Sequence, residues 1–133
     1  MTLMLVSGSH AQAATAKGWF FTPNSEHLQP QVYGGDKSID EYGCIYLGDK
    51  DEKVIYLTFD AGYENGNVEK TLDILNRQQV HGTFFILPHM CRNYTDLVKR
   101  MHDEGHIVGN HTYSHKNVSG MTFEQFENEI TSL

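Results

Sequence analysis

The chain has 133 residues, and 17 acidic side chains against 10 Lys and Arg give it a formal charge of −7 at neutral pH. Apolar residues make up 39% and charged residues 20% of the sequence, as is typical of a globular protein and not of a disordered one. The acidic balance disfavours a nucleic-acid partner, and no apolar run approaches the roughly 20 residues that a membrane span needs.

The first 52 residues show little periodicity. Residues 1–14 combine a short apolar run with Ala11-Gln12-Ala13, the small-residue pattern that signal peptidase recognises. We interpret them as the remnant of a secretory signal, which predicts an extracytoplasmic location; an ordinary disordered leader is the alternative. Residues 15–52 predict an irregular N-terminal arm that packs through Trp19 and Phe20.

From residue 53 onward the sequence becomes regular, and residues 53–133 form the predicted domain. The expected elements are a strand over 54–59, a helix over 67–79, a strand over 83–87, a helix over 93–104, a strand over 106–109 and a helix that opens at 122. Asn67 is the expected N-cap of the first helix, and residues 122–125 have the spacing of a capping box. Strands that alternate with helices predict an α/β fold, with parallel strands joined by right-handed crossovers.

Polar side chains follow the ends of these strands. Asp60 ends the first strand, and His111 and His115 follow the third. Since sites of parallel sheets gather at the carboxyl ends of the strands, these side chains are expected to lie close together. Taken singly, Asp60 could cap a turn and the histidines could be merely solvated. Together they predict metal-assisted hydrolysis, in which a carboxylate takes a proton from water beside an ion held by two imidazoles.

Three segments resemble the motifs of the polysaccharide deacetylases. Residues 58–66, TFDAGYENG, resemble the first motif, T-F-D-D-G; residues 82–85 resemble the second strand; residues 105–115 resemble the second motif, G-N-H-[ST]-x-x-H. The D-x-G-Y-E-N-G form is similar to that of the delta-lactam-forming peptidoglycan N-acetylmuramic acid de-N-acetylases. The resemblance implies a distorted (β/α) barrel, of which residues 53–133 would be a truncated part with about three β/α units.

The resemblance also implies roles for individual residues. Asp60 matches the catalytic base of the family, and His111 and His115 match its metal-binding histidines. The implied cofactor is a divalent ion, with zinc expected. Ala61 occupies the position of the third ligand, an Asp in most members, and a methyl group cannot ligate. We therefore expect weak metal binding.

Residues 62–65 are the expected substrate-binding loop. Gly62 and Tyr63 would lie against the sugar, whereas Glu64 and Asn65 either shape the loop or contact the sugar. The implied reaction is hydrolysis of the N-acetyl group of an amino sugar in peptidoglycan or a related N-acetylated glycan. The family's general-acid histidine would follow Leu133. The alternatives are therefore a catalytically inactive fragment that binds glycan, and a metal-binding protein without catalysis.

Overall fold

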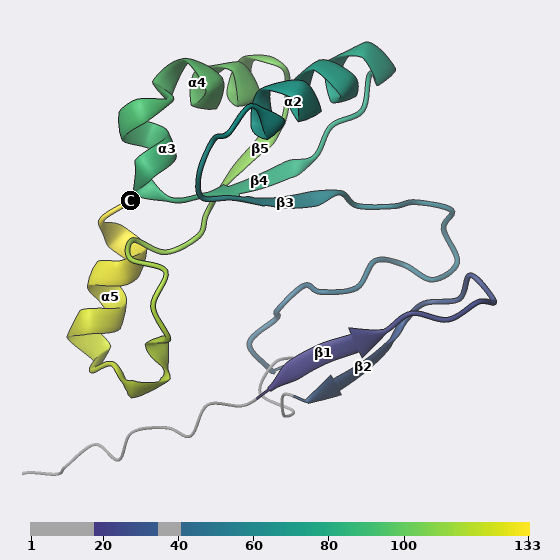
Figure 1. Cartoon of the computed structure of the whole chain (residues 1–133). Helices are drawn as coiled ribbons and strands as arrows, with labels where there is room; N and C mark the ends of the chain where they lie inside the picture. The colour runs from purple at the N-terminus through teal and green to yellow at the C-terminus, as the bar shows by residue number, and fades with distance from the viewer. Residues whose placement is uncertain (1–17, 35–40) are drawn as a thin grey trace, which may run out of the picture.

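The computed structural model describes residues 18–34 and 41–133, in two sheets with helices (Figure 1). An antiparallel pair, β1 (Trp19–Thr22) and β2 (Gln31–Gly34), precedes a parallel three-stranded sheet in the order β3-β4-β5. The parallel strands are β3 (Thr58–Ala61), β4 (Thr83–Ile86) and β5 (Ile107–Asn110). The remaining elements are α2 (Asn67–Gln78), α3 (Pro88–Asn93), α4 (Thr95–Asp103), the 3₁₀-helix η1 (Val118–Gly120) and α5 (Phe123–Thr131). The predicted α/β arrangement with parallel strands is confirmed.

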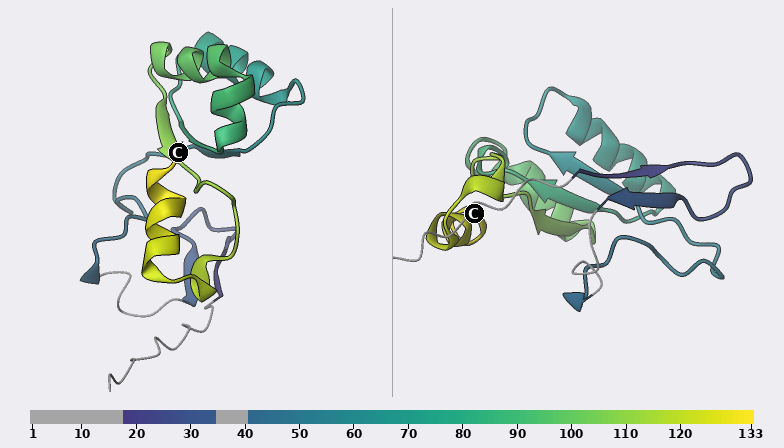
Figure 2. Two further views of the ribbon diagram at one scale, coloured as in Figure 1. Left: turned by 90° about the vertical axis from the view of Figure 1, so that its left-hand side faces the viewer. Right: turned by 90° about the horizontal axis from the view of Figure 1, so that it is seen from below.

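The helices α2, α3 and α4 lie on one side of the parallel sheet (Figure 2). The buried core lies between them and the strands; it consists of Ala61, Leu72, Leu75, Phe84, Ile86, Met90 and Met101. Along β4, Phe84 and Ile86 are buried whereas Thr83 and Phe85 are only partly buried. The alternation in burial shows that one face of the sheet is packed and the other is only partly covered. Parallel strands usually have both faces covered.

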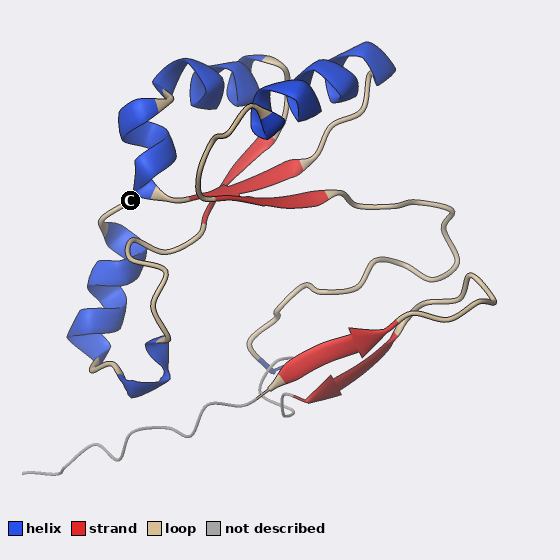
Figure 3. Ribbon diagram, viewed as in Figure 1, coloured by secondary structure: helices blue, strands red, loops and turns tan. Residues whose placement is uncertain are grey.

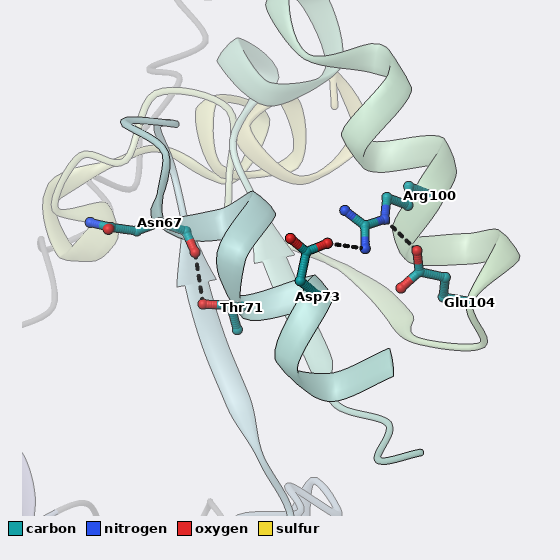
Figure 4. Close-up of polar contacts among 5 residues, drawn as sticks. All are labelled: Asn67, Thr71, Asp73, Arg100 and Glu104. Carbon is teal, nitrogen blue, oxygen red and sulfur yellow. Dashed lines mark hydrogen bonds and ion pairs between the residues drawn. The ribbon is translucent and has the colours of Figure 1, made fainter. Parts of the chain in front are cut away.

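An ion-pair network joins the two long helices on the packed side (Figure 4). The Arg100 guanidinium of α4 donates to Asp73 of α2 at 2.7 Å and also to Glu104. These hydrogen bonds, Glu104 first and Asp73 second, raise the pKa of Arg100 above its ordinary value. The network thereby links α4 to α2.

A buried histidine lies at the opposite end of the sheet from the predicted site. His106 is 5% exposed, and its Nδ1 accepts a hydrogen bond from the Gly82 N–H at 3.1 Å. Its Nε2 atom has no partner within the described part of the chain. Burial lowers the pKa of this imidazole below 6.5, so His106 is a neutral structural group.

Several boundaries differ from those expected. The strand predicted over 54–59 begins only at Thr58, because Val54, Ile55 and Tyr56 lie exposed outside the sheet. The helix predicted over 93–104 is confirmed as α4, at Thr95–Asp103. A further helix that was not predicted, α3, begins at Pro88 and is separated from α4 at Tyr94, where φ is −135°. The strand at 106–109 is displaced by one residue, while the capping box at 122–125 is confirmed.

The N-terminal arm is not irregular over residues 18–34, since these residues include both strands of the antiparallel pair (Figure 3). Trp19 makes an edge contact with Tyr46 at 6.0 Å between ring centroids, and Phe20 stacks on Tyr33 at 5.1 Å. The rings of Trp19 and Phe20 therefore pack within the arm. Aromatic residues also favour strands, and both lie in β1. The predicted signal remnant at 1–14 lies outside the described residues. No helix within 18–34 and 41–133 has the length and apolarity that a membrane span requires.

Candidate active site

The site forms where the three parallel strands end. Asp60 lies in β3, directly opposite Phe85 of β4, and His111 follows β5. The His111 N–H donates to the carbonyl of Ile86 at 3.1 Å, which carries the strand pairing one residue further and brings the imidazole back over the sheet. Residues 51 positions apart in sequence thereby become neighbours.

The predicted reactive groups lie together. His111 Nε2 is 4.0 Å from Asp60 Oδ2, and the rings of His111 and His115 are 4.7 Å apart between centroids. The Asp60 side chain is 70% exposed and that of His111 is 25% exposed. These three residues border an open hollow of about 250 Å³, together with Gly62, Tyr63 and Leu87. The arrangement leaves room for water and a substrate carbonyl beside the carboxylate.

The loop after β3 is fixed by its own side chains. The Glu64 carboxylate accepts hydrogen bonds from the backbone N–H groups of Gly66 and, at 2.9 Å, Val68. It therefore satisfies the free N–H groups at the start of α2, where the N-cap position is Gly66, with φ at +89°. Asn67 as the N-cap is wrong, because that residue already lies within α2. Of the two roles considered for Glu64, the hydrogen bonds favour shaping of the loop.

Close packing explains the glycine in the same loop. A Cβ atom on Gly62 would lie 2.8 Å from Leu87 Cδ1, nearer than side-chain atoms approach. The Tyr63 ring is 70% exposed and lies 4.8 Å from the His89 ring between centroids, while Asn65 is exposed. Gly62 thus lets the loop lie flat on Leu87, and Tyr63 stands over the entrance of the hollow.

The loop after β5 has an unusual backbone. Thr112 and His115 are non-glycine residues in the left-handed region, with φ of 67° and 54°. Each such residue costs about 1–3 kcal/mol and persists only when its surroundings hold it. Within the loop, Asn110 Oδ1 accepts from the Thr112 N–H at 2.8 Å and Thr112 Oγ1 accepts from the His115 N–H at 3.1 Å. In this conformation both imidazoles border the hollow at Asp60.

Helix α5 supplies the rest of the support. The backbone N–H and the hydroxyl of Ser114 donate to the Glu129 carboxylate at 2.7 and 2.6 Å, and the Tyr113 N–H donates to the Glu129 carbonyl at 2.9 Å. The Asn110 amide donates to the Ile130 carbonyl at 2.7 Å. Hydrogen bonds from the Ser114 side chain and then its backbone lower the pKa of Glu129 below 4.5, so this carboxylate stays ionised. Glu129 was not predicted as a site residue, because no local sequence pattern pairs it with Ser114, 15 positions earlier.

The donor set fits a divalent ion only in part. His111 and His115 offer two adjacent imidazoles, which is one ligand fewer than catalytic zinc sites usually have. Ala61, at the position of the third ligand, is 4% exposed and packs in the apolar core. Within the described ranges, no group of three or more His, Cys, Asp or Glu side chains is arranged to hold a metal ion. These residues would hold an ion through the two imidazoles alone, which favours weak binding.

A second hollow adjoins the first. It encloses about 320 Å³ and shares Tyr63, Leu87 and His115 with the hollow at Asp60. The rest of its wall comes from α3, including His89 and Arg92, and from Tyr113 and Ser114 in the loop after β5. His89 Nδ1 is 2.9 Å from the Asn93 amide nitrogen, which also donates to the His89 carbonyl at 3.1 Å. The two hollows therefore lie side by side at the strand ends.

Comparison with known proteins agrees with this geometry. Residues 47–133 match the family model "Polysaccharide deacetylase". The peptidoglycan-N-acetylmuramic acid deacetylase PdaA of Bacillus subtilis (strain 168) is 41% identical over 98% of this chain, which covers 51% of PdaA. A peptidoglycan-N-acetylglucosamine deacetylase of Bacillus cereus is 35% identical over 69% of this chain and 34% of its own length.

The fold comparison gives the same result. The solved structure of Bacillus subtilis PdaA, a family 4 carbohydrate esterase, superimposes with a TM-score of 0.78 and 43% identity, over 86% of this chain and 49% of that structure. The chain thus spans about half the length of PdaA. The predicted deacetylase-type barrel fold, represented here by three parallel strands and their helices, is confirmed. On the family match over residues 47–133 and the likeness to PdaA, the chain belongs to the polysaccharide deacetylases, a family of hydrolases.

Proposed function

We propose that this protein removes the N-acetyl group from N-acetylmuramic acid in peptidoglycan, the step that leads to delta-lactam formation in spore cortex. The observation that carries the proposal is the Asp60 carboxylate within 4.0 Å of His111, beside His115, in an open groove at the strand ends. The likeness to PdaA, whose name gives this substrate, supports the choice of sugar. Because peptidoglycan lies outside the cytoplasmic membrane, the proposal includes an extracytoplasmic location.

The groups in the groove fit amide hydrolysis. Asp60 is exposed, so its carboxylate can accept a proton from a water molecule in the hollow. The water oxygen then attacks the acetamido carbonyl carbon. As the carbon–nitrogen bond breaks, the proton held by Asp60 passes to the nitrogen, so that acetate leaves, the sugar retains an amine and Asp60 is again a carboxylate. His111 and His115, which line the same hollow, lie where they can orient the carbonyl. A divalent ion held by these imidazoles would polarise the carbonyl.

The test is acetate release from peptidoglycan. The 133-residue chain is assayed alone and as a chimera with the remainder of Bacillus subtilis PdaA, since it spans about half of that protein. Acetate is quantified enzymatically, and mass spectrometry of the digested glycan identifies which sugar has lost its acetyl group.

We expect the chimera to release acetate from N-acetylmuramic acid. Release by the chimera but not by the chain alone would support the inactive-fragment alternative for these 133 residues. A folded chimera that releases no acetate from any sugar would refute the proposal.

A further inference from the structure

We infer that Arg92 is a specificity-determining residue, which binds the lactyl carboxylate that distinguishes N-acetylmuramic acid from N-acetylglucosamine; the inference rests on the proposed function. Arg92 lies in the last turn of α3 and lines the second hollow, next to His115. Among the described residues that line this hollow, it is the only one with a permanent charge. A groove that receives a sugar at Asp60 therefore has one cation at its side.

The guanidinium is held in place and still has free donors. Its Nη2 donates to the Tyr113 hydroxyl at 2.7 Å, and its central carbon lies 5.4 Å from the centroid of the Tyr113 ring. No acidic side chain pairs with Arg92 in the portion of the chain that the structure describes. A guanidinium has five N–H groups in a planar fork that matches a carboxylate, so most of them remain available to an anionic ligand.

The charge of the site makes such a cation necessary for an anionic sugar. The chain has a net charge of −7, and the reaction needs Asp60 as a carboxylate. Glu64, in the loop after β3, and Glu129, in α5, add two more carboxylates. A substrate carboxylate would be repelled by all three, and Arg92 offsets this repulsion at one place in the groove.

The chemistry of the sugar fits the placement. In N-acetylmuramic acid the lactyl ether is on the ring carbon next to the one that bears the acetamido group. A substrate whose acetamido carbonyl lies at Asp60 and His111 must therefore hold its carboxylate close by. The two hollows share Tyr63, Leu87 and His115, which puts the cation beside the reaction site and not in a remote cavity. Binding of the carboxylate by Arg92 would fix which face of the acetamido group meets Asp60.

The experiment measures binding to the 133-residue chain by nuclear magnetic resonance titration at pH 7. The probes are the methyl glycosides of N-acetylmuramic acid, of its uncharged carboxamide and of N-acetylglucosamine. We expect the acid to bind about tenfold more tightly than the other two, as a charge-assisted hydrogen bond at a partly exposed site provides. The Arg92→Gln substitution should abolish this preference while leaving the two neutral sugars unchanged.

Further variants separate a local contact from general electrostatics and from misfolding. Arg77→Gln makes the same change of charge at an exposed position on α2 and should leave all three affinities unchanged. Arg92→Lys keeps the charge without the planar fork, and Tyr113→Phe removes the hydroxyl that holds it; both should weaken only binding of the acid, by about two- to fivefold. Amide spectra that match those of the unsubstituted chain show that each variant is folded.

The outcomes distinguish the inference from the function on which it rests. Equal affinities of the unsubstituted chain for all three sugars, or equal weakening of all three by Arg92→Gln, would overturn the role of Arg92 and leave the proposed deacetylation standing. If none of the sugars shifts the resonances of His111 and His115, the role of Arg92 is overturned, while acetate release by the chimera decides the proposed function separately.

Discussion

The two loops that form the site are held in different ways. The loop at 61–66 is fixed by its own sequence. The Glu64 carboxylate accepts hydrogen bonds from the backbone N–H groups of Gly66 and Val68, two and four residues later, where α2 begins. The loop at 110–115 is fixed from a distance, since its Ser114 and Asn110 bind α5 through Glu129 and Ile130. The first loop follows Asp60, the base at the end of β3, and the second presents the histidines. Only the second depends on a helix folding back across the strand ends.

The largest effect should come from replacing Asp60, the base that precedes the first loop. Asp60→Asn in the active chimera removes the proton acceptor with little change in volume, and the rate of acetate release should fall about 10²–10⁴-fold. Asp51→Asn, at an exposed turn outside the groove, is the matched control and should retain full activity. Acetate release within threefold of the unsubstituted protein would remove Asp60 from its assigned role.

The second loop should fail when its distant support is removed. Glu129→Ala deletes the acceptor of both Ser114 hydrogen bonds, and loss of such support typically reduces activity or metal affinity about 10–100-fold. Glu129→Gln keeps an acceptor oxygen, so its activity and zinc affinity should fall much less than those of Glu129→Ala. Zinc affinity by calorimetry is the informative measurement, because it reports on His111 and His115 directly. Unchanged zinc affinity in a folded Glu129→Ala variant would show that the loop holds itself.

A third ligand at position 61, where the first loop begins, tests whether this side of the site can bind a metal ion together with His111 and His115. Ala61→Asp places a carboxylate in an apolar core, which should lower the free energy of unfolding by about 1–3 kcal/mol without metal. Zinc should raise the melting temperature of this variant more than that of the unsubstituted chain, because a third ligand strengthens binding. Ala61→Asn, of the same size but a weaker ligand, is the control. Identical zinc responses of the two variants would show that position 61 cannot reach the ion.

The role of Glu64 can be decided by separating stability from catalysis. If its carboxylate serves the helix, Glu64→Ala should lower the free energy of unfolding by about 1 kcal/mol, as loss of an N-terminal cap does. KM for the glycan should then change little. A large rise of KM with an unchanged melting temperature would instead assign Glu64 to the sugar.

The smallest expected effect concerns His106, at the end of the sheet away from the two loops, where pH should change the stability of the fold. Burial lowers the pKa of His106 below 6.5, so below pH 6.5 the unfolded chain takes up a proton that the folded chain resists. The free energy of unfolding should therefore decrease as the pH falls from 7.5 to 5.5, measured by denaturant titration. His106→Asn should flatten this dependence, whereas replacement of the exposed His102 by Gln should not.

Local patterns determined much of this protein. The helix at 67–78, the strand at 83–86 and the capping box at 122–125 follow from periodicity and from side chains that bond to their own neighbours. The placement of Asp60 near His111 follows from the rule that parallel strands end at one edge. Such features need no information about residues far along the chain.

The tertiary structure decided the rest. Residues 54–57 have the composition of a strand, but a strand needs a partner, and the sheet that the structure describes begins at Thr58. At Tyr94, between α3 and α4, the side-chain hydroxyl donates to the Glu64 carbonyl, 30 residues away, at 3.4 Å. The support of Ser114 by Glu129 and the position of Arg92 beside Tyr113 likewise depend on residues 15 or more positions distant. Sequence spacing contains no record of these contacts, because they exist only once the chain has folded back on itself.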